Sequence, residues 1–352
     1  MKKVVITGGA GFVGSNIAIA LKKNYESSEI VAFDNLHRKG SELNIPRLEA
    51  NGVEFLKGDV RNPDELEKVG DIDFMIECSA EPSVLAGRGG DTDYLIGTNL
   101  QGAINCAEVC RRSDAPMIFL STSRVYPVKP LLNCELREAE TRFELLNSQK
   151  VSGLSEFGVS EEFPMVGARS LYGGTKYAAE IMLGEYRDAF SLPIVINRCG
   201  VLAGPWQFGK ADQGIAAFWT AAHYLEKKLK YIGFGGSGKQ VRDMLHIDDM
   251  IRLVIMQIEN PAKFADEIYN VGGGNFSSAS LLELTAICRS VTGKSVEITP
   301  EPKMRYADIP VYISDNRRIT EFCSWQPEKS IEILIEDIYK WMVDTPGVKE
   351  LF

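Results

Sequence analysis

The sequence predicts an α/β protein built on a doubly wound parallel sheet, followed by a smaller α/β lobe. Three observations predict this fold. Short apolar runs alternate with amphipathic segments through the first 200 residues, which is typical of a parallel sheet with helices on both faces. A glycine-rich turn joins the first apolar run to the first amphipathic segment. After residue 200 the alternation gives way to glycine-rich loops and separate helices.

The expected elements are read from apolar periodicity and turn residues. The strands are Lys3–Thr7, Glu29–Asp34, Val53–Lys57, Asp73–Glu77, Pro116–Ser121 and Pro193–Arg198. The helices that alternate with them are Phe12–Asn24, Asp64–Val69, Tyr94–Arg112 and Ser170–Phe190. Residues 127–168 show little periodicity of either kind. A loop of this length is usually functional or disordered, and we expect it to cover a substrate.

This pattern predicts two domains. Residues 1–200 are expected to form the domain around the parallel sheet, with 240–260 returning to it. Residues 201–239 and 261–352 are expected to form the smaller lobe, which would bind the substrate.

Composition excludes several classes of protein. The net charge of −9 argues against a general binder of nucleic acid or membrane surfaces. No stretch reaches the roughly 20 apolar residues of a membrane span, and the N-terminal residues run directly into a strand. The seven cysteines form no Cys-x-x-Cys pair and the three histidines are scattered. We therefore expect reduced thiols, a cytoplasmic protein and no metal site.

The first turn carries a cofactor motif. Gly8, Gly11 and Gly14 are spaced Gly-x-x-Gly-x-x-Gly between a strand and a helix. In a Rossmann fold these glycines permit a tight turn, close approach of a diphosphate and close helix–strand packing. The helix N-terminus adds N–H donors and a favourable dipole. The sequence therefore predicts a bound dinucleotide in contact with Gly8, Gly11, Phe12 and Val13.

The end of the second strand indicates which dinucleotide binds. Asp34 lies 20 residues beyond Gly14, where a carboxylate can bind ribose hydroxyls and repel a 2′-phosphate, favouring NAD over NADP. Arg38 and Lys39 keep NADP open, because an arginine here can accept that phosphate. Asn99 is either a buried structural amide or a support for the cofactor site. The further cofactor contacts expected are Asn35, Arg38, Asp59, Val60, Ser79, Ala80, Asn99, Ser121 and Cys199.

A second motif is suited to proton transfer. Tyr172 and Lys176 are four residues apart on an expected helix, so they lie on one helix face. Lowering a phenol pKa from about 10 to about 7 requires roughly 4 kcal/mol. A lysine ammonium and an oxidised nicotinamide can supply this by favouring phenolate. Tyr172 and Lys176 are therefore candidate catalytic residues that also contact the cofactor, and a hydroxyl of Ser121-Thr122-Ser123 is expected beside them.

These motifs resemble the extended short-chain dehydrogenase/reductase family, and within it the nucleotide-sugar epimerases. The resemblance covers nearly the whole chain. It includes Val241-Arg242-Asp243 with His246, Arg305 to Pro310, and Ser324 to Pro327. The closest subfamily is that of the CDP-paratose 2-epimerases. That likeness lies in Phe33 to Gly40, Gln207-Phe208, Asp212-Gln213-Gly214 and the long insertion before Tyr172.

The resemblance implies an NAD-dependent enzyme that oxidises a nucleotide sugar to a transient keto-sugar and reduces it again on the other face. It makes Thr122, four residues before Tyr126, the hydroxyl partner of Tyr172 and Lys176. It assigns Arg242 and Arg305 to the substrate diphosphate. The implied partners are a nucleotide sugar, CDP-sugar favoured, and a second or further copies in a homodimer or homotetramer. The implied substrate contacts are Glu81, Ser123, Arg124, Val201, Gln207, Gln213, Arg242, Arg305 and Asp308.

Differences from the family pattern indicate which of the family's reactions to expect. The 4,6-dehydratases carry Asp-Glu directly after the catalytic Thr or Ser, where this chain has Ser123 and Arg124. Without those acids dehydration loses its proton carriers, which favours an epimerase. Cys199-Gly200-Val201 replaces the aromatic residues and asparagine of common 4-epimerases, favouring inversion at C2 of a CDP-sugar, as in O-antigen synthesis. The alternatives are a UDP-hexose or UDP-uronate 4-epimerase, a nucleotide-sugar reductase or dehydratase, and a non-catalytic NAD-binding protein.

Overall fold

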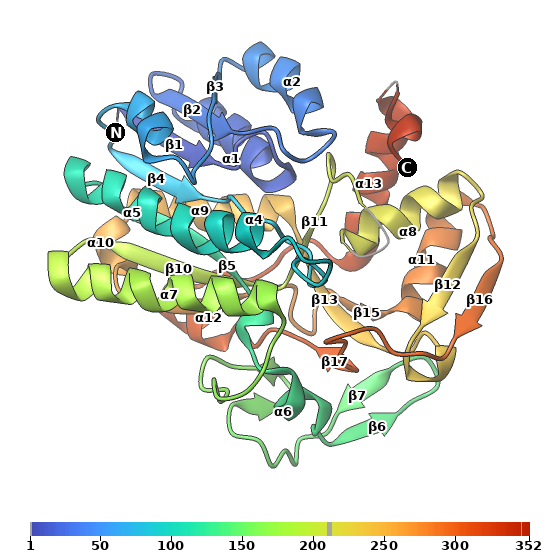
Figure 1. Cartoon of the computed structure of the whole chain (residues 1–352). Helices are drawn as coiled ribbons and strands as arrows, with labels where there is room; N and C mark the ends of the chain where they lie inside the picture. The colour runs from blue at the N-terminus through green and yellow to red at the C-terminus, as the bar shows by residue number, and fades with distance from the viewer. Residues whose placement is uncertain (1, 210–212, 346) are drawn as a thin grey trace. The chain divides into compact units, whose positions relative to one another are not determined.

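The computed structural model describes residues 2–209, 213–345 and 347–352. The chain divides into two compact units, each drawn from several segments (Figure 1). Unit 1 comprises Met1–Thr122, Leu171–Arg198 and Ile251–Ile268. Unit 2 comprises Ser123–Ser170, Cys199–Met250 and Tyr269–Phe352.

The central element is a seven-stranded sheet in the order β14-β10-β5-β4-β1-β2-β3. β1 pairs in parallel with β2 and β4, and the outer pairings β2–β3 and β4–β5 are also parallel. This confirms the predicted fold class, and the six predicted strands lie within one residue of the observed ones. The strands are β1 (Lys3–Thr7), β2 (Glu29–Asp34), β3 (Glu54–Lys57), β4 (Phe74–Glu77), β5 (Met117–Thr122), β10 (Ile194–Cys199) and β14 (Ile268–Val271).

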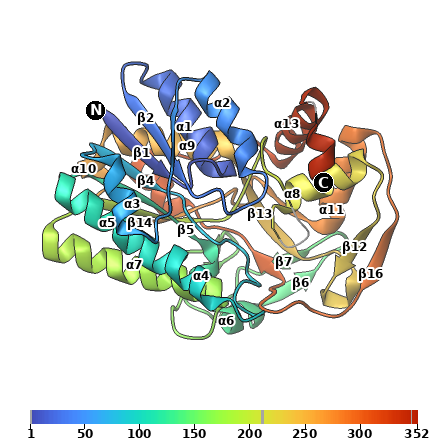
Figure 2. The ribbon, with the colours of Figure 1, turned by 45° about the horizontal axis from the view of Figure 1, so that its top comes forward.

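The helices of unit 1 cover this sheet on both faces. Because side chains alternate along a strand, Val5 faces one side of β1 while Val4 and Ile6 face the other. Figure 2 shows α5 and α7 side by side, as in Figure 1. The helices are α1 (Phe12–Asn24), α2 (Ile45–Ala50), α3 (Pro63–Leu66), α4 (Thr92–Ile96), α5 (Gly102–Ser113), α7 (Leu171–Phe190) and α10 (Pro261–Phe264). A π-helical segment, Gly97–Gln101, joins α4 to α5.

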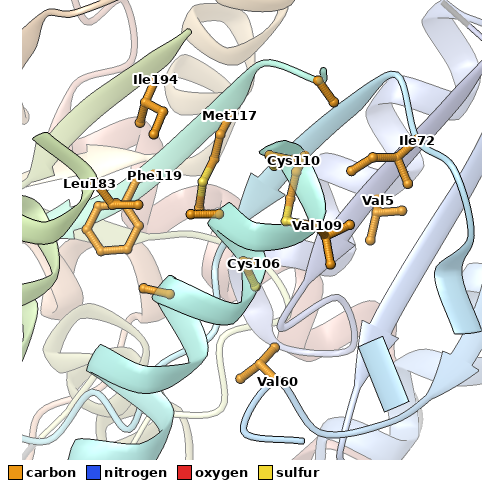
Figure 3. Close-up of a cluster of buried hydrophobic side chains, with 14 of the residues drawn as sticks. Val5, Val60, Ile72, Cys106, Val109, Cys110, Met117, Phe119, Leu183 and Ile194 are labelled. Atoms are coloured by element: carbon orange, nitrogen blue, oxygen red, sulfur yellow. The ribbon is translucent and has the colours of Figure 1, made fainter. Parts of the chain in front are cut away.

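The core between the sheet and the α5–α7 pair is apolar. Figure 3 shows the α5 thiols of Cys106 and Cys110 near Met117 and Phe119 of β5, and all four side chains are buried. Burial raises the pKa of the Cys110 thiol well above its ordinary value, so we assign these cysteines to packing. This face fixes α7, and therefore Tyr172 and Lys176, against the sheet.

Unit 2 is built around β13, which pairs with β11, β15 and β17. The helices α8, α11 and α13 pack together beside this sheet around Trp219, Leu284 and Ile338. The strands are β11 (Val201–Ala203), β12 (Leu229–Ile232), β13 (Val241–His246), β15 (Ser278–Ser280), β16 (Ile298–Glu301) and β17 (Val311–Tyr312). The helices are α8 (Ile215–Tyr224), α9 (Ile247–Glu259, which continues into unit 1), α11 (Leu281–Thr292), α12 (Arg317–Cys323) and α13 (Ile331–Asp344).

Residues 127–168 are more ordered than their weak periodicity suggests. They contain the short helix α6 (Val128–Leu132) and two hairpins, β6 (Leu136–Glu138) with β7 (Phe143–Leu145) and β8 (Leu154–Ser155) with β9 (Gly158–Val159). Leu136, Phe143 and Leu145 pack on Val241, Val311 and Ile313 of unit 2. Strands of two or three residues are too short to show a period, which explains why the sequence did not indicate them.

Candidate functional site

The predicted site residues separate between the two units. Unit 1 holds the three candidate catalytic residues, one predicted substrate contact and most predicted cofactor contacts: Gly8, Gly11, Phe12, Val13, Asp34, Asn35, Arg38, Asp59, Val60, Ser79, Ala80, Glu81, Asn99, Ser121, Thr122, Tyr172 and Lys176. Unit 2 holds Cys199 and the other predicted substrate contacts: Ser123, Arg124, Val201, Gln207, Gln213, Arg242, Arg305 and Asp308.

The glycine turn has the shape that a diphosphate needs. Gly8 adopts φ +62°, and its carbonyl accepts the Gly11 N–H at 3.0 Å. A Cβ on Gly14 would lie 2.3 Å from the Gly8 carbonyl oxygen, and one on Gly8 would lie 2.8 Å from the Cys78 oxygen. Gly11 caps α1 without a side-chain hydrogen bond, and no acid lies in the first turn. The turn therefore offers amide donors to an anion and fits the dinucleotide that the motif implies.

Asp34 is fixed beside this turn. One carboxylate oxygen accepts the Ala10 N–H at 3.1 Å and the other accepts the Leu36 N–H at 2.7 Å. Burial raises the pKa of Asp34, and these backbone hydrogen bonds oppose the rise. The carboxylate is only partly exposed, so it has a defined direction, as a ligand for ribose hydroxyls requires.

Asp59 and Asn35 belong to a polar network next to Asp34. Asn35 donates to Asp59 at 3.0 Å, and Arg61 forms a 2.7 Å ion pair with the same carboxylate. Burial alone would raise the pKa of Asp59, but the hydrogen bonds from Arg61 and Asn35 outweigh it and bring the pKa to about 2. Asp59 is therefore a carboxylate at neutral pH. Val60 is buried, and its carbonyl accepts the Asn105 amide at 2.8 Å.

Sequence reasoning missed an aromatic layer at this end of unit 1. The Tyr94 ring stacks on His37 with 3.9 Å between centroids, and the Arg61 guanidinium lies 4.6 Å from the Tyr94 centroid. The Tyr94 hydroxyl accepts the Asn35 amide at 3.4 Å. Such a layer suits a flat heterocycle. No local spacing connects His37, Arg61 and Tyr94, so this layer could not be predicted from the sequence.

The candidate catalytic residues lie at the end of β5 and on the adjoining α7. Thr122 is the last residue of β5, and Tyr172 and Lys176 occupy the first turns of α7. All three side chains are buried; Thr122 and Tyr172 are each 8% exposed and Lys176 is 1% exposed. The Lys176 ammonium lies 3.6 Å from a Glu77 oxygen and 3.9 Å from the Phe119 ring centroid. The ammonium is thus held close to the β4–β5 edge in a dry environment.

The neighbouring hydroxyl of Ser121 faces a structural ion pair. It donates to Glu180 at 2.5 Å, and the same carboxylate binds the Arg198 guanidinium at 2.7 and 3.1 Å. Glu180 is 4% exposed and Arg198 is 5% exposed. Because this network engages Ser121, Thr122 is the better candidate of the two for contact with a substrate hydroxyl.

Asn99 is a buried structural amide that connects two parts of the site. Its carbonyl accepts the Glu81 N–H at 2.8 Å, and its amide donates to Thr175 at 3.2 Å and to the Glu81 carbonyl at 3.2 Å. It lies in the π-helical segment, a local deformation often found at functional sites. Asn99 thereby ties the Ser79-Ala80-Glu81 loop to the start of α7.

In unit 2 the two predicted diphosphate arginines, Arg242 and Arg305, lie at one turn together with Arg124, another predicted substrate contact. Arg242 donates to Asp308 at 2.7 Å, to the Ile309 carbonyl at 2.8 Å and to the Val241 carbonyl at 2.7 Å. Arg124 donates to the Ala307 carbonyl at 3.3 Å. Arg305 begins this turn, since its carbonyl accepts the Asp308 N–H at 3.4 Å, and its side chain is exposed. The turn thus concentrates positive charge in an acidic chain.

The remaining predicted substrate contacts lie on β11 and the following loop. Val201 is in β11, and the Gln207 amide donates to the Leu202 carbonyl at 2.9 Å. Trp206 and Phe208, on either side of Gln207, contact the Trp341 ring in the unit 2 core. Gln213 is partly buried, whereas Asp212 lies outside the described residues.

A cluster outside this site contains residue types that can bind a metal ion. His246, Asp248 and Asp337 lie together, but Lys329 binds both carboxylates at 2.7 Å. The Asp248 N–H donates to His246 Nδ1 at 3.0 Å, so the ring proton is on Nε2, 3.3 Å from Asp337. The cluster already holds a cation, and its histidine serves to fix the β13–α9 junction. Among the described residues, no helix is both long and apolar enough to cross a membrane.

Comparisons with known proteins agree with this geometry. Residues 4–272 match the NAD dependent epimerase/dehydratase family. The chain is 32% identical over 352 residues to CDP-paratose 2-epimerase of Salmonella typhi, covering 96% of this chain and 98% of that protein. The structure is similar to that of UDP-glucuronic acid 4-epimerase from Bacillus cereus in complex with UDP-glucuronic acid and NAD. That match has a TM-score of 0.79 and 25% identity, and covers 99% of this chain and 100% of the other. The chain therefore belongs to the NAD dependent epimerase/dehydratase family.

Proposed function

We propose that this chain is an NAD-dependent nucleotide-sugar epimerase that inverts C2 of CDP-paratose or a related CDP-hexose. The observation that supports the reaction type is that Tyr172 and Lys176 are both buried in the first turns of α7, and that Thr122 is buried at the end of β5. The 32% identity over almost the full length to a CDP-paratose 2-epimerase supports the substrate. The second candidate is a UDP-uronate or UDP-hexose 4-epimerase, which the likeness to UDP-glucuronic acid 4-epimerase favours.

The proposed mechanism assigns proton transfer to Tyr172. As phenolate, Tyr172 removes the proton from the sugar hydroxyl while Thr122 donates a hydrogen bond to the same oxygen. The Lys176 ammonium favours the phenolate by electrostatic attraction. Tyr172 returns the proton to that oxygen after the keto-sugar has rotated in the site and presents its opposite face. Bound NAD would supply reversible hydride transfer at the carbon that bears this hydroxyl, so that net redox would be zero.

The proposed cofactor contacts are those that shape the glycine turn and its edge. The amides of Phe12 and Val13 would bind the diphosphate, Gly11 would let it approach the backbone closely, and Asp34 would bind the adenosine ribose. Lys176 would bind the nicotinamide ribose. Arg242, Arg305 and Arg124 would bind the substrate diphosphate, because guanidinium groups form paired hydrogen bonds with phosphate oxygens.

Replacing Asp34 tests the cofactor assignment. Asp34→Ala is expected to weaken NAD binding about 10- to 100-fold, as loss of hydrogen bonds to a charged group implies. It should also reduce the preference for NAD over NADP, because the negative charge that repels a 2′-phosphate is gone. Calorimetric titration of both dinucleotides measures this. Glu29→Gln, at the other end of β2 and paired with Lys3 on the surface, is the control; equal NAD affinity in both variants would contradict the assignment.

Arg305 offers a test of the substrate assignment with little cost to folding, because its side chain is exposed. Arg305→Ala is expected to raise KM for the nucleotide sugar about tenfold or more, with a small effect on kcat, because it removes a charge-assisted hydrogen bond to the diphosphate. Steady-state kinetics separates the two constants. Arg289→Ala, an exposed arginine on α11, is the matched control and should leave KM unchanged. An unchanged KM in Arg305→Ala would remove this residue from the site.

A substrate panel tests the proposed function itself. CDP-, UDP-, GDP- and dTDP-sugars are incubated with the purified protein, without added NAD, and the products are identified by NMR and mass spectrometry. Inversion at C2 of CDP-paratose, or more slowly of CDP-glucose, is the expected result. Inversion at C4 of a UDP-sugar would establish the second candidate, and net consumption of NADH would establish a reductase. No turnover of any CDP-sugar would contradict the CDP-sugar assignment.

We also propose a homodimer in the cytoplasm. The side chains of Ile181, Met182 and Phe190 on α7 and Ile96 on α4 are 37–51% exposed, and together they supply apolar area for a second copy of unit 1. The seven cysteines, all among the described residues, form no disulfide bonds, as is usual in reducing compartments. Light scattering after size-exclusion chromatography distinguishes dimer, tetramer and monomer.

A further inference from the structure

Glu77 is a buried acid that the mechanism above leaves without a role. It is the last residue of β4, and its backbone is in register with Thr7 of β1 and Phe119 of β5. Its side chain is 1% exposed. Glutamate is almost never fully buried unless it is paired. Its position at the end of a central parallel strand places it where ligands of such sheets bind.

The partner of Glu77 is the proposed catalytic lysine. The Lys176 ammonium lies 3.6 Å from a Glu77 oxygen, and the two side chains are 2% and 1% exposed. Apart from Ser79, which offers hydrogen bonds to Glu77, no described residue outside the pair forms a hydrogen bond with either group. Desolvating two such charges costs several kcal/mol per ion, so a buried pair is weak evidence of a stabilising role. One member of this pair is the proposed catalytic lysine, which indicates a role in function instead.

The groups around the pair influence the pKa of Glu77 in opposite directions. Burial raises the pKa of Glu77, and the Lys176 ammonium is the largest influence in the opposite direction, followed by Ser79. From α5, Cys106 faces both groups, but burial raises the pKa of its thiol well above the ordinary value, so the thiol is neutral. On α7, Glu180 is neutralised by Arg198. Tyr172 lies one turn before Lys176 on the same helix and is the titratable group that the proposed mechanism uses.

We propose that Glu77 is a positioning residue of the site: as a carboxylate it holds the Lys176 ammonium and sets how strongly that ammonium acts on the Tyr172 phenol. This inference rests on the proposed function for its importance in turnover. The pair itself is a property of unit 1 and can be tested without substrate. The carboxylate lies 3.6 Å from the Lys176 nitrogen in a dry environment, and it moderates the positive field at Tyr172.

The proposal has a directional consequence for pH dependence. Glu77→Gln keeps the shape of the side chain but removes one negative charge. Loss of a nearby negative charge strengthens the positive field at Tyr172, which favours its phenolate. The acidic limb of the bell-shaped profile of kcat, which reports ionisation of Tyr172, should therefore move to lower pH by about one unit. If Glu77 were protonated in the native protein, the same substitution would be electrically neutral and the profile would not move.

Tyrosinate absorbance provides a test that needs no substrate. The ionisation of Tyr172 is obtained by subtracting the pH titration of Tyr172→Phe from that of the parent. The same subtraction is made in the Glu77→Gln background. The expected result is a Tyr172 midpoint about one pH unit lower when Glu77 is replaced. Glu108→Gln is the control. It removes an equal charge on α5, where Glu108 contacts Arg111 and the Tyr186 hydroxyl of α7, and it should leave the Tyr172 midpoint unchanged.

The outcomes separate this inference from the proposed function. A lowered midpoint supports the pair even if no sugar is turned over, and an unmoved midpoint overturns it even if epimerisation is confirmed. If Glu77→Gln fails to fold, the double variant Glu77→Gln/Lys176→Met decides, with thermal unfolding as the readout. Recovery of the folded state in the double variant supports the pair, because the unpaired ammonium has been removed. A double variant no more stable than Glu77→Gln would contradict it.

Discussion

Tyr172→Phe is expected to lower kcat about a thousandfold while the protein remains folded and retains NAD. Removal of a positioned acid–base group typically costs a factor of this order. The substitution deletes one oxygen atom from a ring that is 8% exposed, so packing is preserved while the proposed proton acceptor is lost. Steady-state kinetics gives kcat, and the absorbance of the purified variant with its thermal unfolding profile reports bound cofactor and folding.

The matched control for this variant is Tyr186→Phe on the same helix. The Tyr186 hydroxyl donates to Glu108 at 2.5 Å, so its loss removes a hydrogen bond but no proposed catalytic group. Its kcat should stay within about twofold of the parent, as expected for a change away from the reacting atoms. Near-normal turnover in Tyr172→Phe would show that another residue removes the hydroxyl proton.

Glu180→Ala is expected to have the largest effect on stability, lowering the free energy of unfolding by about 3–5 kcal/mol. Arg198 would then be a buried guanidinium without its carboxylate, and Ser121 would lose the acceptor of its hydroxyl. This loss lies directly beside Thr122 at the end of β5. Urea denaturation followed by circular dichroism measures the change.

A double variant separates the ion pair from its packing. Glu180→Leu/Arg198→Met removes both charges and keeps apolar volume, and such replacements of buried pairs are often neutral or stabilising. We expect it to be more stable than Glu180→Ala. If Glu180→Ala unfolds at the same urea concentration as the parent, the carboxylate does not neutralise Arg198 in the way the structure indicates.

Local sequence signals were sufficient for the parallel sheet. Strands buried on both faces are continuous apolar runs, so β1 and β2 were predicted with their observed bounds and the others to within one residue. The last strand of the sheet in chain order, β14, was missed. The late segment of unit 1 is Ile251–Ile268, which overlaps the expected 240–260. β14 contains Tyr269 and Asn270, and its short mixed pattern does not stand out from a loop.

The site divides in the same way. The glycine turn and the Tyr172–Lys176 spacing are local patterns on single elements, and they could be predicted because helix and turn geometry fixes their meaning. Glu77 on β4 could not be connected with Lys176, because only the strand order brings β4 next to β5 under α7. The stacking of Tyr94 on His37 is likewise a long-range contact without a sequence period.

Deuterium in the product tests the central claim most directly, namely that a phenolate base works with a cofactor that removes and returns hydride. The nucleotide sugar is epimerised in D2O, without added NAD, and the inverted carbon is examined by NMR. The hydride-transfer mechanism predicts that this carbon keeps its original hydrogen, because the hydride never exchanges with solvent. Full deuteration of that carbon would show that inversion proceeds by proton removal from carbon, and would contradict the account.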